Sequence, residues 1–433
     1  MSVTSVLVLF LSVLSAMAPH AAEVRPAALP GEPPEHERAR GRALVPILAE
    51  RAIGYLKSQQ DPQTGGWRTD GKGPIFPAVT GLVVTGMLLD PSASVADDHI
   101  RRAVAYILSC QKPDGGIYDA SLPGYNTSIC VSALTRVRTP EARAAVERGV
   151  AFLRTLQYSE ASLAVDGRLE GTRPVGRDHA FYGGVGYGRH GRPDLSNLGW
   201  MLDALRDAGV EGSDEAFQRA LVFLQRTQML EVTPDDVVVN DMPYAKGSRQ
   251  GGFIYSTSLN QSQVGSGQSM SAGMIEETLD DGTRISRLRA YGSMTYAGFK
   301  SYLYADLPRD DPRVQAALHW IRDHYSLAEN PGLGSEGLYY YYVVMARALA
   351  SWGEDELMVR AGDPGERARD GHPTKAGDLY RPARWADDLA DRLATLQRAD
   401  GSFESLNERW MENDPVLITA YSLIALRHAH GSR

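Results

Sequence analysis

The chain has 433 residues, of which 43% are hydrophobic and 23% are charged, a composition typical of a soluble globular protein with enough apolar material for a large core. Lys and Arg total 45 against 53 Asp and Glu, so the formal charge at pH 7 is −8. The basic residues are scattered rather than gathered in a stripe, which disfavours a nucleic-acid-binding surface. We therefore expect no nucleic-acid partner.

The N-terminal segment is predicted to be a signal peptide over residues 1–22. Residues 3–18 form an apolar run that is short for a membrane-spanning helix, and small residues that suit cleavage follow it. Export to the periplasm or the medium is therefore expected, with an uncleaved anchor or a misassigned start as alternatives. Residues 23–43 are rich in proline and charge, and we expect a disordered linker there.

A repeated phrase then marks the ends of six amphipathic helices. In this phrase a Gln follows an aromatic or apolar residue by five positions, and a Gly-rich turn usually comes next. The six phrases are YLKSQQ at 55, YILSCQ at 106, FLRTLQ at 152, FLQRTQ at 223, WIRDHY at 320 and RLATLQ at 392, with Tyr325 in place of Gln in the fifth.

Each turn leads into a second helix that is apolar nearly all round, as in AVTGLVVTGMLL and VLITAYSLIAL, whereas the first helices keep a charged face. A helix without a polar face must be buried on all sides. Six such helices need an inner ring wrapped by an outer ring of six. The sequence thus predicts an all-α fold, an (α/α)6 toroid barrel, as one domain over residues 44–429. The second helices share a Thr or apolar residue in one frame: Thr80, Thr127, Leu198, Thr295, Tyr342 and Thr419.

The Gly-rich turns are interpreted as stabilising elements without a catalytic role. Glycine allows a tight reversal without a Cβ, and the Gln side chain can satisfy backbone groups that helix ends leave unpaired. We expect each motif to fasten one outer helix to the next. Two interruptions are predicted: an insertion of loop or strands at about 229–290 over one barrel mouth, and a long loop at about 361–384.

The chain has only two cysteines, Cys110 and Cys130, one on each helix of the second pair. Two buried apolar thiols are expected, and an exported protein also permits a disulfide between them. Their spacing does not suggest a metal site.

The turn phrases, such as QKPDGGIY, resemble the QW repeats of squalene–hopene cyclases and the related repeats of protein prenyltransferase β subunits. Phrases such as GGVGYGRHGRPDLSN and RWMENDPVLITAY are similar to bacterial prenyltransferase and squalene oxidase repeat proteins. The resemblance covers about residues 44–429. It implies the terpenoid cyclase and prenyltransferase (α/α)6 superfamily, and cyclase-like chemistry on an isoprenoid.

The catalytic motifs of those families are missing. None of the six inner-helix starts, FPAVT, PGYNT, DLSNL, YGSMT, YYYYV and PVLIT, contains the D-x-D-D-T acid of the cyclases. YGSMTYAG lacks the zinc-binding Asp and Cys of the prenyltransferases, and Val343 stands where those sequences tend to carry His. We therefore expect no metal and no cofactor.

One formal match remains: Asp387, Asp388 and Asp391 have the D-D-x-x-D spacing of a magnesium-diphosphate motif. They precede RLATLQ on a helix that the repeat assigns to the outer ring. A solvated acidic face is therefore the better interpretation.

Candidate acids stand ahead of inner helices or in mouth loops. Asp194, Asp241 and Asp414 are the candidates for a single catalytic acid. Asp119 and Glu412 also stand ahead of inner helices or in mouth loops. A carboxylate at a helix start can also simply cap backbone amides, and Asp194 is well placed for that.

Aromatic residues are dense in the same turns. Their faces can stabilise a carbocation or bind an apolar or sugar-like ligand. The predicted lining residues are Tyr125, Tyr291, Tyr296, Tyr341 and Trp410.

Three functions follow from these observations. The leading hypothesis is a terpenoid cyclase-like protein that acts on an isoprenoid or other apolar small molecule by acid-initiated carbocation chemistry with a non-standard acid, with peripheral membrane contact kept open. The alternatives are a non-catalytic exported scaffold that binds lipid or protein, and a polysaccharide lyase or hydrolase. A dry aromatic pocket with one buried acid would favour cyclisation, an open polar groove would favour glycans, and a filled barrel would favour a scaffold.

Overall fold

The computed structural model describes residues 40–69, 73–160, 164–165, 168–169, 174–189, 191–259, 268–279, 281–361 and 380–431. The predicted signal peptide lies outside the described residues, and so does the predicted linker up to residue 39. The first helix begins at Arg40, four residues before the predicted start of the barrel.

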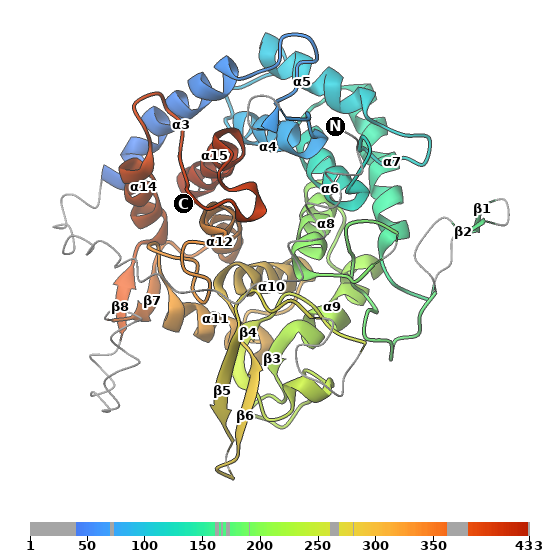
Figure 1. Cartoon of the computed structure of the whole chain (residues 1–433), viewed down its shortest axis with the longest axis vertical. Helices are drawn as coiled ribbons and strands as arrows, with labels where there is room; N and C mark the ends of the chain where they lie inside the picture. Colours follow the sequence, from blue (N-terminus) through green and yellow to red (C-terminus); the bar gives the residue numbers. More distant parts are fainter. Residues whose placement is uncertain are drawn as a thin grey trace.

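Twelve α-helices in the described part of the chain form two concentric rings (Figure 1). The outer ring contains α3 (Arg40–Ser58), α5 (Asp98–Ser109), α7 (Pro140–Leu156), α9 (Glu215–Thr227), α11 (Pro312–His324) and α14 (Trp385–Leu396). The inner ring contains α4 (Pro77–Leu88), α6 (Pro123–Leu134), α8 (Leu195–Asp207), α10 (Gly292–Tyr304), α12 (Leu338–Trp352) and α15 (Pro415–Gly431). Both rings close, because α15 packs against α4 and α14 packs against α3. The predicted (α/α)6 arrangement of helix pairs is confirmed.

Burial follows the predicted division between the two rings. In α4 every residue from Pro77 to Met87 is buried, whereas α5 buries only the stripe Ile100, Ala103, Val104 and Ile107. The inner helices pack against neighbours on all sides, and the outer helices keep their charged faces in water.

The Gly-rich turns fasten neighbouring outer helices as expected. In five units the Gln Nε2 donates to a glycine carbonyl of its own turn and to a carbonyl of the next outer helix, at 2.7 to 3.1 Å. The turn glycine lies against the same helix at a φ between +79° and +90°. The Gln residues are Gln60, Gln111, Gln157, Gln228 and Gln397, and the glycines are Gly65, Gly115, Gly183, Gly251 and Gly401.

The shared Thr of the inner helices closes the same turns from inside. The hydroxyls of Thr80, Thr127, Thr295 and Thr419 accept the backbone N–H of Trp67, Ile117, Phe253 and Phe403, respectively. These four turns are therefore bonded both to the next outer helix and to their own inner helix, whereas the turn after Gln157 has Leu198 in place of the Thr.

The unit that ends in Tyr325 uses a different contact. The Tyr325 hydroxyl approaches Asp388 Oδ2 at 3.5 Å, on the next outer helix. The outer-ring position predicted for the D-D-x-x-D segment is correct, but the solvated face is wrong for Asp387. That carboxylate is 2% exposed and pairs with Arg42 and Arg384. These ion pairs connect the start of α14 to the start of α3.

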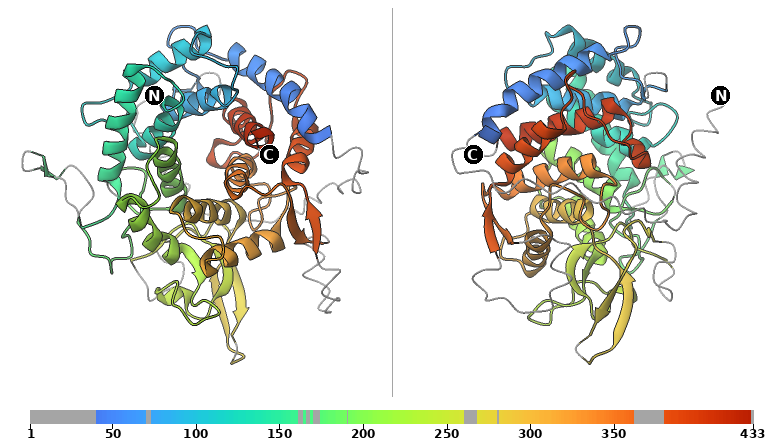
Figure 2. Two further views of the ribbon diagram at one scale, coloured as in Figure 1. Left: turned by 180° about the vertical axis from the view of Figure 1, so that it is seen from behind. Right: turned by 60° about the vertical axis from the view of Figure 1, so that its left-hand side comes forward.

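Four small hairpins complete the described fold (Figure 2). They are β1 (Ala164–Val165) with β2 (Arg168–Leu169), β3 (Gln228–Leu230) with β4 (Arg249–Phe253), β5 (Met274–Thr278) with β6 (Arg284–Leu288), and β7 (Leu357–Arg360) with β8 (Tyr380–Ala383). Two short 3-10 turns cover Pro243–Ala245 and Arg409–Met411.

The predicted insertion does contain strands, but β5 and β6 project outward from the edge of the ring instead of covering its opening (Figure 1). Bonds from Phe253, Tyr255 and Ser271 nevertheless connect the described part of this insertion to residues of the mouth. The predicted loop at 361–384 ends in a strand, since β8 begins at Tyr380.

Cys110 and Cys130 are free and buried, which agrees with two apolar thiols. Burial raises the pKa of both. Among the described helices, none combines the length and the apolar character needed to span a bilayer.

Candidate functional site

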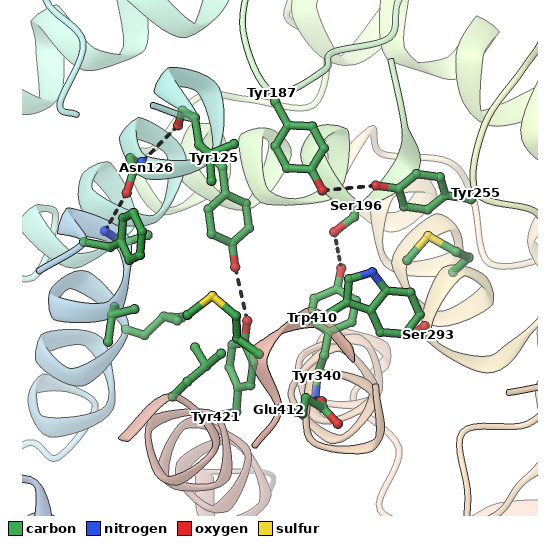
Figure 3. A pocket seen from close by; sticks show the side chains of 18 of the residues that line it. Tyr125, Asn126, Tyr187, Ser196, Tyr255, Ser293, Tyr340, Trp410, Glu412 and Tyr421 are labelled. Carbon is green, nitrogen blue, oxygen red and sulfur yellow. Dashed lines mark hydrogen bonds between the residues drawn. The ribbon is translucent and has the colours of Figure 1, made fainter. Parts of the chain in front are cut away.

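A cavity of about 120 Å³ opens where the inner helices begin (Figure 3). All six inner helices contribute a residue from their first two turns: Ala78, Asn126, Ser196, Ser293, Tyr340 and Tyr421. The first backbone amides of a helix carry partial positive charge, so this mouth favours negative charge on a group placed within it.

Aromatic side chains make up much of the wall. The Tyr residues are Tyr125, Tyr187, Tyr255, Tyr291, Tyr340 and Tyr421, and Trp410 joins them. Their hydroxyls pair across the cavity: Tyr125 with Tyr421 at 3.1 Å, Tyr187 with Tyr255 at 3.4 Å, and Tyr340 with Ser196 at 2.9 Å (Figure 3). Burial raises the pKa of each of these phenols, so they are neutral at ordinary pH. The wall thus offers ring faces and neutral hydroxyls.

Three of the five predicted aromatic residues, Tyr125, Tyr291 and Trp410, line the cavity. Tyr296 and Tyr341 do not, because they pack edge to face at 5.6 Å within the core. The Tyr341 hydroxyl donates to the Ser326 carbonyl at 2.8 Å, on the side of the outer layer.

Within the run of four tyrosines at 339–342, the residue that lines the cavity is Tyr340, the neighbour of the predicted Tyr341. One residue along a helix turns the side chain by about 100°. An error of one position therefore moves the predicted tyrosine from the cavity into the layer between the rings.

Glu412 is the carboxyl group in the cavity wall. It is 1% exposed, and its Oε1 accepts the Tyr340 N–H at 2.8 Å in the first turn of α12. Its Oε2 has no hydrogen-bond partner among the described residues. Burial raises its pKa to about 7, although the α12 amides oppose that shift. A large share of this side chain therefore keeps its proton at neutral pH.

Asp194 lies behind the wall, 2% exposed, as the N-cap of α8. Its two oxygens accept the backbone N–H and the side-chain Nδ2 of Asn197, both at 2.8 Å. Burial raises its pKa to about 6 despite these bonds. The capping expected as the alternative is present, together with a perturbed carboxyl group beside three cavity tyrosines, Tyr187, Tyr255 and Tyr291.

The other candidate acids have different environments. Asp414 is buried and caps α15 through the Leu417 N–H at 2.9 Å. Asp241 is exposed and is held by two bonds from Arg226, which lower its pKa. This ion pair leaves Asp241 without a proton to donate near neutral pH. Asp119 is exposed.

The segment that carries Glu412 is fixed by contacts from three directions. Arg409 lies over the Trp410 ring at 4.3 Å, pairs with Glu336 and donates to Ser271 Oγ at 2.9 Å. Trp410 and Met411 have φ values of 55° and 62°, a left-handed conformation unusual for large side chains. Such strain persists only where surrounding contacts enforce it, and here it precedes the buried acid directly.

The opposite end of the barrel is closed by buried ion pairs. Lys300 Nζ contacts Asp203 at 2.6 Å, and both side chains are 2% exposed. Arg347 bridges Asp203 to Asp207 at 3.3 and 3.2 Å, and Arg136 also reaches Asp207. These residues lie in the C-terminal halves of inner helices or just beyond them, where carbonyl ends favour cations. Ion pairs thus occupy the end of the barrel away from the mouth.

No metal site emerges from the part of the chain that the structure describes, which holds no group of three or more His, Cys, Asp or Glu placed to share an ion. Neither the Asp387 segment nor Val343 belongs to such a group.

The solved structures similar to this chain share its helical toroid. The alpha-1,6-mannanase of Salegentibacter sp. HEL1_6 has a TM-score of 0.52 at 9% identity, over 89% of this chain and 98% of that one. An inactive variant of that enzyme, in complex with alpha-1,6-mannotriose, has a TM-score of 0.51 at 9% identity over the same shares. A type II terpene cyclase from Scytonema has a TM-score of 0.35 at 13% identity, over 91% of this chain and 100% of that one.

At these identities the similarity shows the fold alone, which defines the chain as an (α/α)6 toroid protein. Glycosidases and a terpene cyclase are thus both among the proteins that this chain is similar to. No protein-family model matches the chain, and no curated protein matches it either.

Proposed function

We propose that the protein is a hydrolase that cleaves a C–O bond of a glycan, with Glu412 as the general acid in the mouth cavity. The observation that carries this proposal is Glu412 itself: a buried carboxyl group in the cavity wall, with one oxygen bonded to the start of α12 and the other unpaired among the described residues.

The strength of the acid favours an oxygen as the proton acceptor. Burial raises the pKa of Glu412 by destabilising its anion, so the group keeps its proton near pH 7 but is a weak acid. General acids of this kind protonate leaving-group oxygens, as in glycoside hydrolysis. An alkene carbon is a much weaker base and needs a stronger acid, so the cyclisation hypothesis becomes the second candidate.

The wall chemistry suits a sugar. Tyrosine offers an apolar face and a polar edge in one side chain, and the cavity combines six of them with Ser196, Ser293 and Asn126. Glycoside hydrolysis also uses two carboxyl groups with different environments, and Asp194 is the second perturbed carboxyl group at this mouth. The glycosidases of similar fold are a precedent for the scaffold.

The test is reducing-sugar release from a panel of α- and β-linked oligosaccharides, starting with alpha-1,6-mannotriose. Wild type is compared with Glu412→Gln. This variant keeps an oxygen that can accept the Tyr340 amide, but it has no acidic proton to transfer. Glu408→Gln is the matched control, because Glu408 is exposed on the same segment. We expect a loss of at least about 100-fold for the first variant and none for the second. Equal activity of all three proteins, or no release from any glycan, would reject the proposal.

The second candidate, an isoprenoid-directed protein, is favoured by the apolar part of the wall: Val79, Leu82, Met294 and Leu417. Its test is mass spectrometry of an organic extract of natively purified protein against a denatured control. A stoichiometric isoprenoid without turnover would favour the lipid-binding scaffold, and conversion of that isoprenoid would favour a cyclase. Export and peripheral membrane contact are separate proposals, tested by cell fractionation.

A further inference from the structure

Trp410 differs from the other tryptophans of the chain in its contact with water. It is 43% exposed and lines the mouth cavity, two positions before Glu412 (Figure 3). The remaining five of the six are at most 5% exposed: Trp67, Trp200, Trp320, Trp352 and Trp385. A single exposed apolar side chain is common on protein surfaces, so its function must be argued from how the ring is held.

Contacts from three parts of the chain hold this exposed ring in one place. The Arg409 guanidinium lies over it at 4.3 Å and is itself fixed by Glu336 and Ser271. Gly337, the N-cap of α12, lies so close that a Cβ there would be 3.1 Å from the indole. The backbone of Trp410 is strained, with a φ of 55°. Strain of this kind is typical of ligand-binding sites, where a side chain must be held ready.

The size of the cavity indicates which part of a ligand this ring would meet. A protein cavity of about 150 Å³ accepts one six-membered ring such as benzene. The mouth cavity, at about 120 Å³, therefore has room for about one sugar ring. The next ring of an oligosaccharide must then lie toward the rim, where Trp410 is exposed.

We propose that Trp410 is the stacking platform for the second sugar ring of the substrate, and so a residue that favours oligosaccharides over monosaccharides. The C–H groups on one face of a pyranose can cover the indole and remove its apolar surface from water, while the hydroxyls stay hydrated. Arg409 occupies one side of the indole, so the sugar takes the surface that remains exposed. The inference rests on the proposed function for the chemical class of the ligand.

Acrylamide quenching of tryptophan fluorescence tests the contact, because Trp410 supplies the exposed indole. The protein is Glu412→Gln, in which turnover is prevented, and the ligands are the α- and β-linked oligosaccharides of the hydrolysis assay, each compared with its own monosaccharide. We expect an oligosaccharide that binds to lower the quenching to the level of Glu412→Gln/Trp410→Phe. Its monosaccharide should protect the indole less.

Titration calorimetry in the same background measures what the contact contributes to affinity. Trp410→Ala should weaken oligosaccharide binding by about tenfold and leave monosaccharide binding unchanged, and Trp410→Tyr should restore most of the loss. A general structural defect would weaken both ligands equally. Leu406→Ala is the matched control, because Leu406 is a 93% exposed apolar residue on the same loop that does not line the cavity.

The outcomes separate this inference from the hydrolase proposal. Cleavage of a glycan that leaves Trp410 fully quenchable would overturn the platform and keep the hydrolase. Protection of Trp410 by a glycan that the wild type does not cleave would keep the platform and reject the hydrolase. Oligosaccharide binding that is equally tight in Trp410→Ala, or no binding of any glycan, would also overturn the platform. The quenching measurement needs only the intact Trp410, so it decides the matter if Trp410→Ala does not fold.

Discussion

At the residue scale, the site depends on how differently one residue type behaves in two environments. Glu408 and Glu412 are four positions apart on one segment, yet the first is exposed and the second is 1% exposed. Burial destabilises the carboxylate anion, and only Glu412 acquires a pKa near neutrality. Glu412 and Asp414 are two positions apart and both were candidate acids. No local sequence pattern distinguished the acid in the cavity wall, Glu412, from the helix-capping residue, Asp414.

The raised pKa of Glu412 predicts a pH-dependent stability. Because its folded-state pKa is about 7 against an ordinary 4.5, the folded protein binds more protons than the unfolded chain between these values. This contribution to the free energy of unfolding is fully present below about pH 4.5 and is lost as the pH rises through 7. Removing it with Glu412→Gln should change the stability difference from wild type by up to about 3 kcal/mol between about pH 4 and pH 8.

Urea denaturation at a series of pH values measures this difference, with the exposed Glu408→Gln as control. If the wild-type and Glu412→Gln curves run parallel across this range, Glu412 titrates normally and is not the buried acid described above.

At the element scale, the Gly-rich turns pack closely against the next outer helix. Gly183 has a φ of +80°, and a Cβ there would lie 1.9 Å from the Arg219 carbonyl of α9. Gly209 has the same kind of φ, +81°, but a Cβ there would meet nothing within 4 Å. Comparing substitutions at the two glycines therefore distinguishes the energetic cost of a left-handed backbone from the cost of a steric clash with the neighbouring helix.

We predict that Gly209→Ala costs about 1 kcal/mol, from the left-handed conformation alone. Gly183→Ala should cost at least about 3 kcal/mol, because α9 must also move away from the turn. Chemical denaturation of both variants measures the two costs. Equal losses would mean that the turn does not press against the neighbouring outer helix.

At the scale of the whole molecule, the two ends of the barrel differ. One end has the mouth cavity, and the opposite end contains a cluster of ion pairs. Two aspartates and three cations from α8, α10, α12 and the turn after α6 meet there, with Asp203, Lys300 and Arg347 buried. Burial lowers the pKa of His428 beside them to about 3, so it stays neutral. A buried pair contributes little by itself, but one unpaired buried charge is costly.

Lys300→Met should therefore destabilise the protein by about 3 to 5 kcal/mol, because it leaves Asp203 with only the shared Arg347. The double variant Lys300→Met/Asp203→Leu should recover most of that loss, since Arg347 keeps Asp207. Arg219→Met, which breaks a surface pair with Glu215, is the control at under about 1 kcal/mol. Guanidinium is unsuitable here because it screens charge, so urea unfolding is the measurement. A double variant no more stable than Lys300→Met would exclude a simple ion-pair closure.

The sequence by itself determined the ring architecture of this protein. The Gln and Gly positions, the amphipathic outer helices and the apolar inner helices are local patterns, and a helix without a polar face has few ways to be buried. The six pairs, their order and the fastening turns therefore followed from the repeat, as did Tyr125, Tyr291 and Trp410 at the mouth. The strands in the insertion were also visible, although their direction away from the mouth was not.

Only the tertiary structure decided which side chains carry the chemistry. Tyr340 instead of Tyr341 lines the cavity because helix phase is fixed by packing against both rings, and one residue changes the direction by about 100°. Glu412 is protonated near neutral pH, Asp241 is ionised by Arg226 and Asp387 is buried in ion pairs, although all three are acidic residues near helix starts. Burial and pairing arise from elements far apart in the chain, so no local pattern encodes them.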